Sequence, residues 1–213
     1  MKFVLGEKIK MTQIFDEKGN VVPVTLVKVS PNIVLQVKTQ EKDGYRAVQV
    51  GFGERKEKNI KKPQKGHFKD LGSFMYVREF RIPASPAGGK NQESSLNRGD
   101  KVDVSIFSEG DEVKISGIAK AKGFQGVVKR YRFGGAPATH GTKHAHRQPG
   151  SIGGAGGRAG GKVAKGMRMA GRMGGKRISV RHLKIAKVDI ENNLLAIKGA
   201  VPGRRGTMLE IRG

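Results

Sequence analysis

The chain has 213 residues, and its 42 Lys and Arg against 18 Asp and Glu give it a formal net charge of +24 at pH 7. It has no cysteine, which excludes disulfide frameworks, thiolate metal sites and cysteine nucleophiles. No apolar run approaches the roughly 18–20 residues of a membrane span, and the charged first eight residues are unlike a signal peptide. We therefore expect an intracellular protein whose partner is a polyanion, usually nucleic acid and less often an anionic membrane surface.

The N-terminal half has the pattern of short β-strands. Turn-forming residues at 16–20 precede a strand rich in β-branched residues at 21–29, and a Ser-Pro-Asn turn leads into a strand at 33–37. Asp43-Gly44 indicates a hairpin into a strand at 45–52.

Residues 54–69 break this pattern. Six lysines crowd around Pro63, which predicts an exposed basic excursion with one short helix near Gly66–Phe68. A strand at 74–82 and a polar loop at 83–99 follow. Apolar alternation then returns over 102–106 and 113–115.

The most informative feature is a stretch without acidic residues. Residues 113–188 contain no Asp or Glu, but they hold 18 Lys and Arg and 17 of the 32 glycines. The other 137 residues carry 24 basic and 18 acidic side chains. Because a long structureless segment inside a compact domain is usually functional, we expect partner binding here rather than a passive surface.

Strands are expected again at 185–190, 194–197 and 208–211, the first two joined by an Asn192-Asn193 turn. Many short strands and few helices predict a mainly β fold, a small β-barrel whose first and last strands close together. The expected organisation is a barrel of residues 1–118 and 178–213, with a small α+β excursion at about 54–98. Residues 119–177 form a long Gly-rich basic extension.

Basic and aromatic side chains alternate at the start of the extension, where a short helix is expected over 123–133. Lys129, Arg130 and Arg132 supply charge beside flat rings, a combination that suits RNA. An equally good interpretation of Phe124 and Phe133 is that they anchor the helix to the barrel.

Two further patterns in the extension suggest chemistry but lack essential parts. His140, His144 and His146 invite a zinc hypothesis, yet no carboxylate lies nearby and the surrounding cations oppose a metal. We expect nucleic-acid contact or packing within the loop instead. Gly156–Lys162 imitates a phosphate-binding P-loop, but Val163 replaces the Ser or Thr that would hold magnesium.

Several motifs, in order along nearly the whole chain, resemble the bacterial form of the ribosomal protein L3 family of the large subunit. They are 5–15 (LGEKIKMTQIF), 51–54 (GFGE), 66–68 (GHF), 123–130 (GFQGVVKR), 138–141 (ATHG), 146–153 (HRQPGSIG), 165–174 and 201–203 (VPG). The resemblance implies a translation-protein-type β-barrel with an extension that reaches through rRNA toward the peptidyl-transferase centre. It also implies a non-enzymatic structural protein of the cytoplasmic ribosome that binds 23S rRNA early in assembly and adjoins other large-subunit proteins.

No membrane, cofactor, metal or small-molecule substrate is expected. The same resemblance implies that residues of the extension contact rRNA. They are Lys120, Lys122, Phe124, Lys129, Arg130, Arg132, His140, His144, His146, Arg147, Arg158, Lys162, Lys165, Arg168, Arg172, Lys176 and Arg177.

Two other classes of function compete with this hypothesis. A DNA-compacting protein would also be basic, but no helix-turn-helix or zinc finger is visible and a glycine loop suits irregular RNA better. An enzyme acting on phosphorylated substrates would need acidic metal ligands near the basic loop, and residues 113–188 have none.

Overall fold

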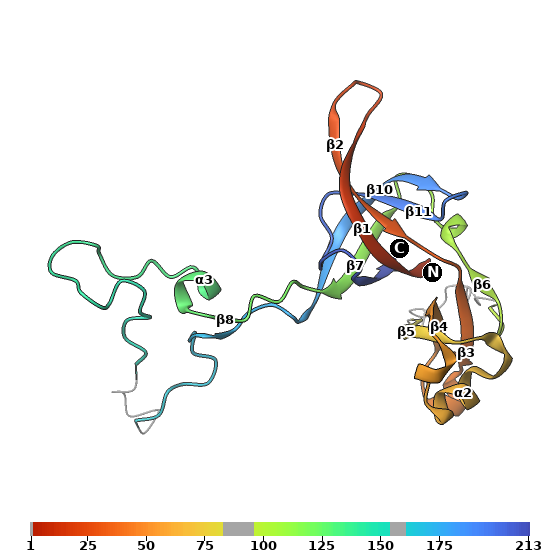
Figure 1. The fold of residues 1–213 in the computed structure, drawn as a ribbon, viewed down its shortest axis with the longest axis horizontal. Helices are drawn as coiled ribbons and strands as arrows, with labels where there is room; N and C mark the ends of the chain where they lie inside the picture. Colours follow the sequence, from red (N-terminus) through yellow and green to blue (C-terminus); the bar gives the residue numbers. More distant parts are fainter. Residues whose placement is uncertain (1, 83–95, 154–160) are drawn as a thin grey trace, which may run out of the picture. The chain divides into compact units, whose positions relative to one another are not determined.

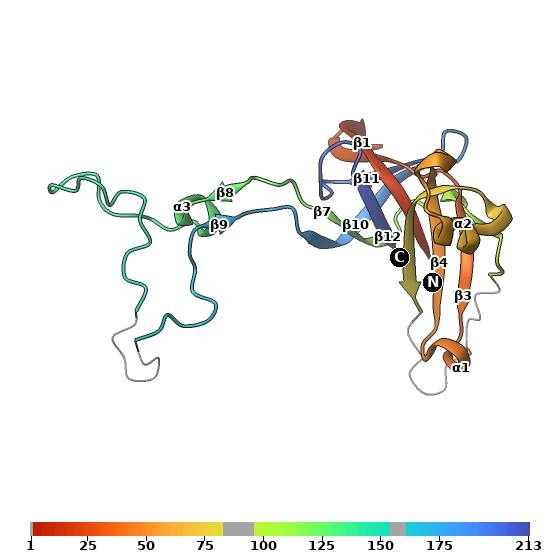
Figure 2. The ribbon, with the colours of Figure 1, turned by 60° about the horizontal axis from the view of Figure 1, so that its bottom comes forward.

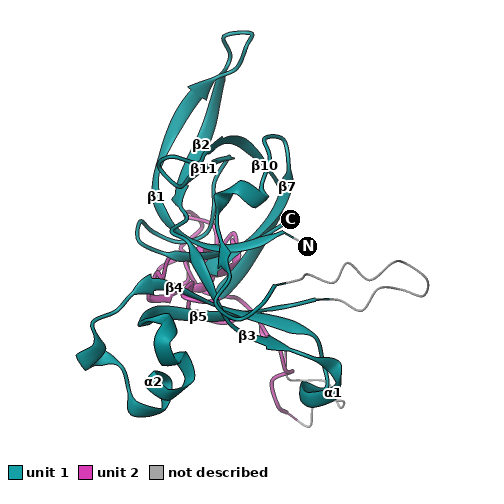
Figure 3. Ribbon diagram, turned by 90° about the vertical axis from the view of Figure 1, so that its right-hand side faces the viewer, with its two compact units in different colours: residues 1–118, 177–213 teal, residues 119–176 magenta. Residues whose placement is uncertain are grey.

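The computed structural model describes residues 2–82, 96–153 and 161–213. The chain divides into two compact units, shown in different colours in Figure 3. Unit 1 comprises residues 1–118 and 177–213, and unit 2 comprises residues 119–176. The secondary structure is mainly β, as the sequence predicted.

Six strands of unit 1 close into a barrel in the order β1-β12-β7-β10-β11-β2 (Figure 1). Their bounds are β1 (Phe3–Phe15), β2 (Val21–Lys28), β7 (Glu112–Ile118), β10 (Arg177–Asp189), β11 (Leu194–Lys198) and β12 (Met208–Arg212). The first and last strands pair antiparallel, with Phe3 opposite Arg212, which confirms the predicted closure. A closed barrel leaves no long unpaired edge that could template aggregation.

Alternate side chains of these strands fill the barrel interior. The fully buried members include Val4, Val27, Ile115, Leu195, Ile197, Leu209 and Ile211. Burying each such side chain contributes roughly 1.5–3 kcal/mol, so this cluster is the main source of stability for the barrel.

Strand β1 was not predicted, because Glu7, Lys8 and Lys10 interrupt its apolar pattern. The structure shows how Lys8 is accommodated. Its side chain is buried, and Nζ donates to the carbonyl oxygens of Val201 at 2.8 Å and Gly203 at 3.1 Å. Hydrogen bonds to the buried ammonium offset the cost of removing it from water.

A second sheet of unit 1 has the order β5-β4-β3-β6. It consists of β3 (Asn32–Lys38), β4 (Ala47–Glu54), β5 (Phe74–Arg81) and β6 (Lys101–Val102). The expected strands at 33–37, 45–52 and 74–82 are therefore present, but they form this sheet rather than the barrel. Phe3 of β1 joins the two sheets by stacking on Phe80 of β5, with ring centroids 4.6 Å apart.

Asn32 ties the second sheet to the barrel through polar contacts. Its fully buried side chain accepts from the Leu5 amide at 2.9 Å and donates to the Leu5 carbonyl at 3.1 Å. Nδ2 also donates to the carbonyl of Ser30 at 2.9 Å. These bonds fix the chain where it leaves the barrel.

The helices of unit 1 are short. They are α1 (Gln40–Asp43), α2 (Lys62–Phe68) and the 3-10 turns η1 (Glu57–Asn59), η2 (Lys69–Leu71) and η3 (Val104–Ile106). Helix α2 confirms the predicted helix near Gly66–Phe68 and is longer than expected, with Phe68 buried beneath it.

Two local predictions needed correction. The predicted hairpin is present, since β3 pairs antiparallel with β4 and Lys38 lies opposite Ala47. Its connection, however, contains helix α1, which Gly44 closes with a φ of 76°. The strand expected over 102–106 ends at Val102. The Asp103 carboxylate accepts from the Ser105 amide at 3.0 Å and starts η3 there.

Unit 2 contains a two-stranded ladder of β8 (Phe124–Gln125) and β9 (Gly171–Arg172), together with helix α3 (Val127–Tyr131) (Figure 2). The helix expected over 123–133 is thus shorter. Residues 124–125 are extended, and Arg132 ends α3 in the left-handed region, with a φ of 61°. Among the described residues, no helix is long and apolar enough to cross a membrane.

Candidate nucleic-acid interface

Unit 2 carries positive charge that no acidic residue within the unit balances. Residues 119–176 hold 13 Lys and Arg and no Asp or Glu. Every ion pair between described residues involves only unit 1. The exposed cations of unit 2 are Lys120, Lys122, Lys129, Arg132, Lys143, Arg147, Lys162, Lys165, Arg168, Arg172 and Lys176. Such a surface attracts polyanions from a distance.

Backbone hydrogen bonds join the two chain segments at the ends of unit 2. The Ala119 amide donates to the Lys176 carbonyl at 2.9 Å, and the Lys122 amide donates to the Met173 carbonyl at 2.9 Å. Farther along, Phe124 lies opposite Arg172 in the β8–β9 ladder, and its ring is 75% exposed. The ladder therefore presents an exposed aromatic residue and an exposed arginine at paired positions.

Gly174 is required for this close approach. Its φ is 73°, and a Cβ added there would lie 2.1 Å from the Lys120 carbonyl oxygen. A larger residue would force the two segments apart and strain the backbone.

A cluster of aromatic and guanidinium groups fixes helix α3. Nη1 of Arg130 donates to the Met169 carbonyl at 2.6 Å, and its guanidinium lies 4.9 Å from the Tyr131 ring centroid. The Arg168 guanidinium lies 5.9 Å from the same ring. The Arg130–Met169 hydrogen bond and the Arg168–Tyr131 cation–π contact join segments about forty residues apart in the chain. Arg130 thus has a structural partner, while its predicted contact with rRNA stays a prediction.

The predicted histidines lie on one open loop. His140, His144 and His146 are exposed, and His140 has a φ of 58°. Within the described ranges, no group of three or more His, Cys, Asp or Glu could hold a metal ion. Arg147 follows directly and is also exposed.

The remaining predicted residues fall in three places. Lys120, Lys122, Lys129, Arg132, Lys162, Lys165, Arg168, Arg172 and Lys176 are exposed on unit 2. Arg158 lies outside the described residues. Arg177 is the first residue of β10 in unit 1 and forms an ion pair with Glu210, whose carboxylate also lies 3.5 Å from Nε of Arg78.

Two residues of unit 2 were missed. Lys143 is exposed and belongs to the same acid-free run, so charge alone would have included it. Tyr131 was recognised as a ring but not as a site residue. Its place between two arginines depends on a contact with Arg168 that no local pattern predicts.

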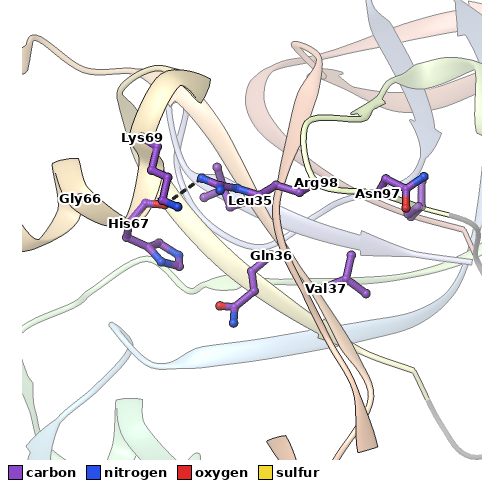
Figure 4. Close-up of a pocket in the computed structure, with 9 residues that line it drawn as sticks. Leu35, Gln36, Val37, Gly66, His67, Lys69, Asn97 and Arg98 are labelled. Atoms are coloured by element: carbon purple, nitrogen blue, oxygen red, sulfur yellow. Dashed lines mark hydrogen bonds between the residues drawn. The ribbon is translucent and has the colours of Figure 1, made fainter. Parts of the chain in front are cut away.

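Unit 1 has a groove between β3, α2 and residues 96–98, which Figure 4 shows. Arg98 crosses it, and Nη2 donates to the carbonyls of His67 at 3.3 Å and Phe68 at 3.2 Å. His67 in turn contacts Oε1 of Gln49 at 2.5 Å through Nε2. None of its lining residues is Asp, Glu, Ser, Thr or Cys, so it has no acidic metal ligands for chemistry on phosphorylated substrates.

Known proteins resemble this chain over nearly its whole length. A family model described as Ribosomal protein L3 matches residues 93–193. Large ribosomal subunit protein uL3 of Chloroherpeton thalassium is 48% identical over 213 residues, covering 99% of this chain and 98% of the relative. The protein of that name from Finegoldia magna is 46% identical over 214 residues, covering 100% and 97%. That of Herpetosiphon aurantiacus is 44% identical over 209 residues, covering 98% and 94%.

Proposed function

Since the chain belongs to the ribosomal protein L3 family, we propose that it is a structural constituent of the large ribosomal subunit and binds 23S rRNA directly. The observation that carries the proposal is the unbalanced charge of unit 2. Thirteen cations and no carboxylate lie within 58 consecutive residues, and the ion pairs of the described residues neutralise none of them.

The binding mechanism is electrostatic and geometric. Lys and Arg side chains of unit 2 neutralise phosphates and release condensed counterions, which makes affinity strongly dependent on salt. Exposed rings such as Phe124 stack on unpaired bases. Glycines such as Gly174 let the backbone pass where a Cβ would not fit.

Unit 2 is the extension that reaches toward the peptidyl-transferase centre, and its early binding to rRNA nucleates assembly. Arg158, which the structure does not describe, belongs to the same acid-free run and takes the same role. Arg177 contributes from the first residue of β10, where Glu210 orients it. The other partners are neighbouring large-subunit proteins. The protein is located in the cytoplasmic ribosome and catalyses no reaction.

A deletion tests this proposal. Because the Ala119 amide and the Lys176 carbonyl are 2.9 Å apart, a short Gly-Ser linker can replace Lys120–Gly175 while Arg177 and its partner Glu210 remain. We expect the remaining unit 1 to unfold cooperatively near the temperature of the full chain. It should have lost most of its affinity for 23S rRNA and should not enter functional subunits.

Binding to duplex DNA of equal length is the matched control for polyanion specificity. Equal affinity of the full chain for DNA and for folded rRNA would support a DNA-compacting protein instead. Normal incorporation of the deletion variant into active subunits would disprove the role assigned to unit 2.

A further inference from the structure

Unit 2 contains a cavity of about 460 Å³ between residues 133–136 and 145–150. This volume lies within the roughly 300–1,000 Å³ typical of small-molecule sites. Five of its eight lining residues are Gly or Ala, so most of the wall is backbone. The larger side chains that line it come from Phe133, Gln148 and Pro149.

The path of the backbone builds the cavity. Gly135 has a φ of 77°, and a Cβ added to it would lie 2.1 Å from the carbonyl oxygen of His146. The two segments therefore touch backbone to backbone at this point. A turn in which the Gln148 amide donates to the Ala145 carbonyl at 3.1 Å shapes the opposite wall. A cavity formed in this way does not depend on the rotamers of long side chains.

The lining groups match the chemistry of a nucleobase. Phe133 supplies an aromatic ring on which a base can stack. The Gln148 carboxamide supplies two donors and one acceptor carbonyl, and it has no side-chain hydrogen bond to the described part of the chain.

Charge around the cavity fits the flanking sugar-phosphate backbone. Arg132 directly precedes Phe133, Arg147 directly precedes Gln148, and both arginines are exposed. No acidic residue occurs in unit 2 to repel phosphates.

We propose that this cavity binds one unstacked base of 23S rRNA. The base stacks on Phe133 and hydrogen-bonds through its edge to the Gln148 amide, while Arg132 and Arg147 contact the adjoining phosphates. The proposal rests on the proposed function, because it requires that unit 2 bind rRNA. It goes further by assigning base recognition to one place in the extension.

The test uses the full-length chain in complexes with purified 23S rRNA. Ala145→Leu fills the cavity without changing charge, and Phe133→Leu removes the stacking ring. Ala164→Leu is the matched control, since Ala164 is exposed in unit 2 and does not line the cavity. Base-directed chemical modification reports on single bases, and hydroxyl-radical cleavage of the same complexes reports on the backbone.

We expect one base to be shielded by the unmodified chain and by Ala164→Leu, and to become reactive with the other two variants. Backbone protection should persist in all complexes, and affinity should fall about tenfold for Phe133→Leu, as for loss of one stacked base. Identical base reactivity in all four complexes, with the backbone still protected, would overturn the base site alone. The base site would also be overturned if Ala145→Leu changed base reactivity only in complexes that contain another ribosomal protein. Absence of backbone protection by the unmodified chain would refute the proposed function and the base site together.

Discussion

Replacing four cations of unit 2 should flatten the salt dependence of rRNA binding without unfolding the chain. The substitutions are Lys143→Gln, Lys162→Gln, Lys165→Gln and Arg172→Gln. All four side chains are exposed, and none forms an ion pair with a described residue. Exposed substitutions of this kind usually change stability by no more than about 0.5 kcal/mol each.

The magnitude follows from counterion release. Each phosphate contact contributes about −0.7 to −0.9 to the slope of log affinity against log salt. Removing four contacts should therefore make the slope shallower by about 3. Between 50 and 200 mM salt the unmodified chain should then lose about 50- to 150-fold more affinity than the variant.

The assay is equilibrium binding to 23S rRNA at five KCl concentrations. A matched control removes the same charge from exposed positions of unit 1, and it comprises Lys18→Gln, Lys184→Gln, Lys187→Gln and Lys198→Gln. We expect the control to retain most of the original slope. An equal flattening by both variants would show that net charge alone drives binding, and the role assigned to unit 2 would be wrong.

Two predictions concern unit 1. Phe80→Ala removes a fully buried ring that stacks on Phe3, and it should lower the free energy of unfolding by about 3–5 kcal/mol in denaturant titrations. Met75→Ala, at a 54% exposed position, should have little effect. Equal losses for the two variants would contradict the packing argument. Nζ of Lys38 lies 2.8 Å from Oε2 of Glu79 and holds the pKa of Glu79 below its ordinary value of 4.5. This pair therefore stabilises the fold above pH 4.5, and its contribution to stability is lost as the pH falls through the lowered pKa. Glu79→Gln should make the loss of stability between pH 6 and 3 less steep, and an unchanged acid profile would exclude the pair as a contributor.

Local pattern predicted most strands of this protein, because β-branched alternation and turn residues act over a few neighbours. It failed where a strand carries charge. Lys8 interrupts the pattern of β1, and its burial depends on carbonyls of Val201 and Gly203 nearly two hundred residues away. The first half of β10 was also missed: expected from residue 185, it begins at Arg177, because cations interrupt its apolar pattern.

The candidate interface, too, could be predicted from the sequence only in part. The acid-free run and its cations are visible in composition, and unit 2 falls inside that run. The Tyr131 cluster depends on Arg168, which is distant in the chain. The cavity beside Phe133 likewise depends on Gly135 meeting the backbone of His146.

The amino-acid sequence by itself determined a mainly β fold, membership of the ribosomal protein L3 family and the position of a cationic segment without carboxylates. These properties reside in composition, in ordered motifs and in short-range periodicity. Only the tertiary structure decided which strands close the barrel and which form the second sheet, that Arg177 pairs with Glu210, and that residues 133–136 and 145–150 line one cavity. Each of these depends on contacts between residues far apart in the chain, and local pattern contains no information about such pairings.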